Sequence, residues 1–154
     1  MKDIYLLLIL ILSCKVGFSQ NLTNSSWNTT NIVDGDTFYA AQNNKEYKFR
    51  LIGIDAPESC HPNKPVQAYS NEAKRELEKL LYATEIFIEF DIQQQDQYGR
   101  YLAYVYIDDL FVNSHLVKSG LANLMTIAPN SKYTDVLLES LESAKRARVG
   151  LWSE

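Results

Sequence analysis

The alternation of apolar and polar residues predicts a strand-rich N-terminal half. Residues 31–41 and 46–54 are rich in β-branched and aromatic residues, and the Asp-Gly pair at 34–35 predicts a two-residue hairpin turn that divides the first run. Residues 85–90 and 100–107 alternate in the same way, and a polar loop separates them. The pattern therefore predicts five short, mainly antiparallel strands.

Three other segments have apolar residues at helical spacing. Residues 66–81 form the clearest of them, 112–119 form a short helix closed by Gly120, and 133–148 form a longer helix that ends at Gly150. The apolar face expected on the first helix comprises Tyr69, Ala73, Leu77, Leu80 and Leu81. Five strands and three helices predict an α+β domain, a small β barrel with helices packed around it.

The first nineteen residues have the pattern of a secretory signal peptide. Lys2 precedes an apolar run at 4–12, and Gly17 and Ser19 occupy the −3 and −1 positions of a cut before Gln20. A buried N-terminal helix is disfavoured because no polar residue divides the run into faces. We therefore expect a protein that is secreted or periplasmic, with a signal peptide at 1–19.

Lipidation at Cys14 is the alternative form of export. The letters ILSC partly resemble the lipobox of bacterial lipoproteins, but Leu12 is atypical at the second position, which favours soluble export. Residues 20–30 are polar and are predicted to form a flexible lead-in, which places the folded domain at 31–154.

Composition limits the class of protein. A chain of 154 residues with 46% hydrophobic content suits one globular domain with its own core. Cleavage before Gln20 leaves Cys60 as a single cysteine, so no internal disulfide is expected. It also leaves 13 basic and 18 acidic residues, a net charge of −5, which argues mildly against a broad polyanion-binding surface.

Charged residues stand where the strands should be apolar. Asp36 and Arg50 lie in predicted strands, Asp55 and Glu58 follow one, and Arg100 begins another. Each has a structural explanation as a turn or surface residue. Together, carboxylates that bind a hard cation and position water, with guanidinium groups that neutralise phosphate oxygens, are what metal-assisted phosphodiester cleavage requires.

Several motifs in this chain resemble the staphylococcal nuclease (thermonuclease) family in the same order and at similar spacing. They are DGDT at 34–37, RLIGIDAPE at 50–58, HP at 61–62, DQYGRYLAYVY at 96–106, VNSHLVKSGLA at 112–122 and the terminal GLWSE. The resemblance covers about residues 30–154. It implies a five-stranded OB-type barrel with three helices, and a calcium-dependent phosphodiesterase that acts on DNA and RNA.

The resemblance also implies a metal site. Matching positions make Asp36 and Asp55 side-chain ligands of Ca²⁺, with the backbone carbonyl of Ala56 as a third ligand. A hard oxygen site with few protein ligands and several waters suits calcium, and magnesium remains an alternative on general grounds.

The remaining matched positions concern the substrate. Glu58 is expected to act as general base or to orient the attacking water, and Arg50 and Arg100 to grip the scissile phosphate. Tyr98 keeps its place beside Arg100 as a substrate-binding residue, and Lys64 is expected to supply local positive charge.

Two departures from the family pattern predict a weaker grip on nucleic acid. Thr126 and Ala128 stand near the positions of a tyrosine pair, in a segment one residue shorter, and Gln97 replaces a lysine. The alternative function is a non-catalytic nuclease-like module that binds nucleic acid or protein. Because the catalytic positions are filled, we favour the nuclease, and we expect a monomer with no stable protein partner and no membrane span.

Overall fold

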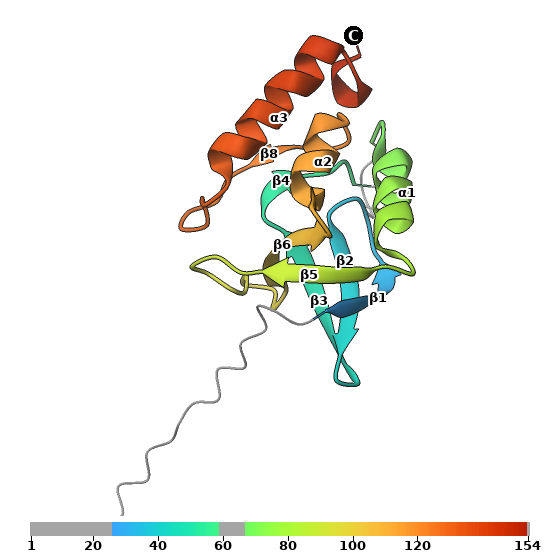
Figure 1. Cartoon of the computed structure of the whole chain (residues 1–154). Coiled ribbons are helices and arrows are strands. Elements are labelled where there is room, and N and C mark those ends of the chain that lie inside the picture. The colour runs from blue at the N-terminus through green and yellow to red at the C-terminus, as the bar shows by residue number, and fades with distance from the viewer. Residues whose placement is uncertain (1–25, 59–66, 154) are drawn as a thin grey trace, which may run out of the picture.

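The computed structural model describes residues 26–58 and 67–153, which form a closed barrel with three helices packed against it (Figure 1). The barrel strands are β1 (Trp27–Ile32), β2 (Thr37–Gln42), β3 (Lys45–Leu51), β5 (Glu85–Glu89) and β6 (Tyr101–Ile107). They follow the order β3-β2-β1-β5-β6 with antiparallel neighbours, and a parallel pairing of β3 with β6 closes the barrel. The predicted five-stranded barrel with three helices is confirmed.

Short elements extend the barrel in ways that periodicity did not predict. β4 (Gly53–Asp55) pairs with β8 (Asn123–Met125), and β7 (Leu110–Phe111) pairs with the end of β6. A 3₁₀ turn, η1 (Gly150–Trp152), follows the last helix. Elements of two or three residues are too short for alternation to be recognised.

The helices are α1 (Ser70–Leu81), α2 (Val112–Lys118) and α3 (Thr134–Ala147), close to their predicted bounds. Figure 1 shows α1 beside the barrel, with α2 between the barrel and α3. The three residues of the predicted α1 face that are completely buried are Ala73, Leu77 and Leu81. Leu80 packs against the core while partly exposed.

The N-terminal boundary of the domain differs from the prediction. β1 begins at Trp27, within the segment expected to be a flexible lead-in. Trp27 is completely buried and packs edge-on against Tyr47 and Phe49, with ring centroids 5.4 and 5.2 Å apart. A single core aromatic in a polar run creates no periodicity, which is why the sequence did not reveal this strand. The signal-peptide and Cys14 predictions lie outside the described residues.

The Asp-Gly pair does not form the predicted two-residue turn. Neither residue has a positive φ, and the connection from β1 to β2 spans residues 33–36, with the Val33 amide donating to the Thr37 carbonyl at 2.9 Å. Gly35 is needed for space instead, since a Cβ there would lie 2.6 Å from that of Ala73 and 2.7 Å from that of Ala56. The tight turn with two positive φ values is at residues 43–44, between β2 and β3.

Candidate active site

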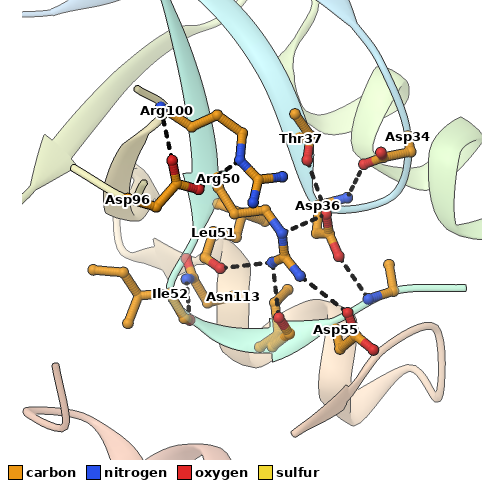
Figure 2. A network of polar contacts seen from close by, with 12 residues as sticks. Asp34, Asp36, Thr37, Arg50, Leu51, Ile52, Asp55, Asp96, Arg100 and Asn113 are labelled. Carbon is orange, nitrogen blue, oxygen red and sulfur yellow. Dashed lines mark hydrogen bonds and ion pairs between the residues drawn. The ribbon is translucent and has the colours of Figure 1, made fainter. Parts of the chain in front are cut away.

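Arg50 is the centre of the polar network shown in Figure 2. It pairs with Thr37 across β2 and β3, next to Asp36. Its Nε lies 3.0 Å from Oδ1 of Asp36, and its Nη2 lies 3.0 Å from Oδ1 of Asp55. One edge of the guanidinium group therefore faces two carboxylates that are nineteen positions apart in sequence.

The other end of the guanidinium is fixed to the main chain. Nη1 of Arg50 donates to the carbonyl of Leu51 at 2.9 Å and to that of Ile54 at 2.8 Å. These bonds span the bend between β3 and β4, so the arginine that was predicted to bind phosphate also shapes the segment carrying Asp55. Its side chain is only 12% exposed.

The carboxylate of Asp36 is buried, with 5% of the residue exposed. Its Oδ2 accepts the amide N–H of Ala56 at 2.7 Å, and its Oδ1 accepts the hydroxyl of Thr37 at 3.0 Å. Burial raises the pKa of Asp36 to about 7, although the charge of Arg50 opposes the shift. The ionised form is thus poorly solvated, and a cation bound here would stabilise it.

The oxygens of Asp36 and Asp55 form the part of the predicted metal site that the fold brings together. Both approach one guanidinium edge, and the Asp36 side chain bonds to the backbone of Ala56. Two carboxylates beside a main-chain segment suit a hard divalent cation that completes its shell with water. In the described part of the chain, no group of three or more His, Cys, Asp or Glu residues is arranged to hold a metal ion.

Glu58 is not joined to these carboxylates. It is exposed, and its described bonds are made by its backbone: its amide donates to Oε1 of Gln67 at 2.9 Å, and its carbonyl accepts the amide of Gln67 at 3.4 Å. The described contacts do not join its side chain to Asp36 or Asp55, and its role as general base or water orienter stays a prediction. Lys64, the other predicted substrate contact nearby, lies outside the described residues.

Arg100 is held by a turn that Asp96 organises. Oδ1 of Asp96 accepts the amides of Tyr98 at 2.9 Å and Arg100 at 3.0 Å, and Oδ2 accepts Nε of Arg100 at 2.7 Å. Burial raises the pKa of Asp96, but these bonds outweigh it and the net pKa is lowered. The guanidinium lies 5.4 Å from the ring centroid of Tyr98. Asp96 thus fixes Nε and leaves the terminal nitrogens of Arg100 available.

Both arginines line one cleft of about 330 Å³. Its walls come from the β3–β4 bend, the β5–β6 loop, β6, and the segment that follows β8. The lining residues outside the β3–β4 bend are Gln93, Asp96, Gln97, Tyr98, Arg100, Leu102, Met125, Ile127 and Asn130. The cleft combines two cations with an apolar floor and rim.

The apolar rim of the cleft is formed by neighbours of the two positions that were matched to a tyrosine pair. Met125 and Ile127 line the cleft, whereas Thr126 and Ala128 are not among its lining residues. Ile127 is 65% exposed, and Tyr98, which also lines the cleft, is 75% exposed. Large apolar side chains exposed beside two arginines can contact a flat, apolar ligand group.

The buried side-chain amide of Asn113, which sequence reasoning missed, holds together the elements that carry the cleft. Asn113 on α2 accepts the amide of Val105 at 3.0 Å and donates to the carbonyls of Ile52 at 2.9 Å and Ala103 at 3.3 Å. It joins α2 to β6 and to the β3–β4 bend, as Figure 2 shows in part. Its only sequence signal was an amide on the buried side of a short apolar helix.

The geometry can be compared with known proteins. A family model described as staphylococcal nuclease homologue matches residues 48–154, a range that includes Arg50, Asp55 and Arg100 but not Asp36. A thermonuclease of Staphylococcus hyicus is 34% identical over 133 residues, which cover 86% of this chain and 79% of that protein. A thermonuclease of Staphylococcus intermedius is 34% identical over 87% of this chain and 80% of its own length.

A third relative gives the same result. The endonuclease YncB of Bacillus subtilis is 36% identical over 79% of this chain, although the match spans only 59% of that protein. Matches at this identity over most of the chain, together with a closed five-stranded barrel, do not arise from composition. The chain belongs to the staphylococcal nuclease family.

Proposed function

We propose that this protein is a calcium-dependent nuclease that hydrolyses phosphodiester bonds of DNA and RNA by attack of water. The observation that carries the proposal is that Arg50 and Arg100 line one cleft, while Arg50 is also paired with the carboxylates of Asp36 and Asp55. Family membership and the endonuclease and thermonuclease relatives support it.

The cation would be held by Asp36, Asp55 and the carbonyl of Ala56. When bound, a divalent cation neutralises phosphate charge and makes its bound water more acidic. Arg100 offers its terminal nitrogens to the phosphoryl oxygens, where a planar fork stabilises the charge that develops in the transition state. Glu58 is exposed and lies three residues after Asp55 in sequence. We assign to it the role of accepting a proton from the attacking water or of orienting that water.

Substrate contacts beyond the phosphate are assigned to the rim of the cleft. Tyr98 offers a ring on which a base can stack, and Met125 and Ile127 offer apolar contact elsewhere along the same cleft. Lys64 remains a proposed source of positive charge. Because the chain is acidic overall, with a net charge of −4, we propose that binding relies on these local contacts more than on a broad electrostatic field.

We also propose export of the protein. Its support is the signal-peptide pattern at residues 1–19, with lipidation at Cys14 as the alternative form. Among the helices of residues 26–58 and 67–153, none is long and apolar enough to cross a membrane.

Cleavage assays test the activity directly. The purified protein is incubated with plasmid DNA and with RNA, in calcium or in chelator, beside the Arg100→Ala variant. We expect both substrates to be degraded with calcium and neither with chelator. Binding of oligonucleotides without any cleavage would support the non-catalytic module instead.

A further inference from the structure

A buried side chain, that of Asn130, joins two segments that both line the cleft. Tyr98 and Arg100 belong to the β5–β6 loop, and Ile127 belongs to the segment after β8. Asn130 is 3% exposed, its Oδ1 accepts the amide of Gln93 at 2.8 Å, and its Nδ2 donates to the carbonyl of Gln93 at 2.8 Å. The side-chain amide of Asn130 thus pairs with both the backbone N–H and the backbone carbonyl of Gln93 in the β5–β6 loop.

The backbone of Asn130 transmits this pairing to the rim. Its amide donates to the carbonyl of Ile127 at 3.1 Å, closing a tight turn. On the other side, Gln94 is tied to β6 by the amide of Leu102, which donates to its carbonyl at 2.9 Å. The path from β6 to Ile127 therefore runs through the side chain of Asn130.

A second tie lies outside the cleft and does not replace the first. The carboxylate of Asp91 accepts the amide of Lys132 at 3.1 Å and the hydroxyl of Tyr104 at 3.0 Å. It ties Lys132, five residues after Ile127 and two residues before α3, to β6. Loss of Asn130 would leave α3 docked while the turn that carries Ile127 loses its contact with Gln93.

We propose that Asn130 is a positioning residue for substrate binding, which holds the turn that carries Ile127 against the β5–β6 loop so that an unpaired nucleobase can contact Ile127 and Tyr98. The inference rests on the proposed nuclease function. Asn130 acts through Ile127, because its side-chain oxygen and nitrogen are already bonded to Gln93 and it is almost completely buried. The chemistry at the phosphate, which Arg100 and the carboxylates perform, does not depend on it.

The test compares Asn130→Ala with Ser140→Ala as a matched control. Ser140 is also buried, and its hydroxyl bonds that of Ser114 at 2.8 Å and the carbonyl of Val136 at 2.9 Å, joining α2 to α3 away from the cleft. Each variant is measured for resistance to denaturant, for KM and kcat on single-stranded DNA, and for the Kd of an uncleavable oligonucleotide analogue. Asn130→Asp, which keeps the acceptor and loses the donor, guards against a misfolded alanine variant.

We expect Asn130→Ala to raise KM and Kd by about tenfold with kcat within about threefold of the parent, and Asn130→Asp to fall between the two. Ser140→Ala should lose stability and keep the parental KM and Kd. A parental KM and Kd in both Asn130 variants, or a fall in kcat alone, would overturn the inference. If the parent does not cleave, the proposed function fails, and the Kd comparison still decides the role of Asn130.

Discussion

Nε of Arg50 and Oδ1 of Asp36 form an ion pair at 3.0 Å, which joins the proposed phosphate-binding cation to the proposed metal ligand. Asp55 takes the adjacent nitrogen of the same edge. A phosphate and these carboxylates therefore compete for the guanidinium, and a cation and the guanidinium compete for the carboxylates. Occupation of the carboxylates by a cation should release the edge of Arg50 for phosphate.

Calcium and substrate should consequently bind with positive coupling. We expect saturating calcium to strengthen binding of an uncleavable dinucleotide analogue by at least about tenfold, equivalent to about 1.4 kcal/mol. The measurement is isothermal titration calorimetry with calcium or with chelator. In Arg50→Ala the enhancement of analogue binding by calcium should be smaller, because the guanidinium that competes for the carboxylates is absent both with calcium and with chelator. An equal enhancement in parent and variant would contradict this coupling.

The raised pKa of Asp36 gives stability a specific pH dependence. Because the folded pKa of about 7 lies above the ordinary value of 3.8, the folded protein binds more protons between these values. In chelator, stability from this group should be greatest below pH 4 and should be lost as the pH rises through 7. Urea unfolding between pH 5 and pH 8 measures it, in a window where Asp96, whose pKa is lowered, stays ionised.

The matched variant for this prediction is Asp36→Asn, which removes the titration. Its free energy of unfolding should vary less with pH across the same window. Calcium affinity of the parent should change in the opposite sense, rising with pH, since a cation binds the ionised carboxylate. A calcium affinity that is constant from pH 5 to pH 8 would remove Asp36 from the metal site.

Arg100→Lys should lower turnover far more than affinity. Asp96 holds Nε of Arg100 at 2.7 Å and aims a planar fork at the cleft, whereas lysine offers one point charge. Loss of one preorganised donor to a developing oxyanion typically costs about 2.7 to 4 kcal/mol, or about a hundred- to a thousandfold in rate. Single-turnover cleavage under saturating calcium, beside direct binding of the analogue, separates the two effects. Turnover within a few-fold of the parent would make Arg100 a surface cation only.

Substitutions on the apolar rim should change KM according to their position. Ile127→Tyr should lower KM for single-stranded DNA, because stacking of a base on an aromatic ring is worth about 1 to 3 kcal/mol. Thr126→Tyr is the control, since Thr126 does not line the cleft and its replacement should leave KM unchanged. Steady-state kinetics on one oligonucleotide suffice. A lower KM for Thr126→Tyr than for Ile127→Tyr would instead assign base stacking to the positions of Thr126 and Ala128.

The rim of the cleft shows where positional matching reaches its limit. Successive residues of an extended chain face opposite sides, so a segment that is one residue shorter exchanges the faces. Met125 and Ile127 line the cleft, and Thr126 and Ala128, the positions matched to the tyrosine pair, do not. The strands and helices were predictable because their periodicity is local, and the motifs that carry Arg50 and Arg100 were recognisable because they are long.

Contacts between distant segments were not predictable in this way. Nothing in the sequence around Asn130 indicates a partner at Gln93, since an amide in a loop is ordinarily a turn residue. Trp27 was missed for a related reason, because its burial depends on rings in another strand, at Tyr47 and Phe49. The structural roles of such residues can be recognised only once the structure shows which partners they contact.

The parallel pairing of β3 with β6, which closes the barrel, has a consequence for folding. Arg50 pairs there with Leu102, two residues after Arg100. The two arginines are fifty positions apart in sequence. A strand pairing between segments so far apart should form late, because closing the intervening loop costs conformational entropy before the pairing contributes its own contacts. Recovery of nuclease activity during refolding should therefore lag behind helix formation and report directly on closure of the barrel.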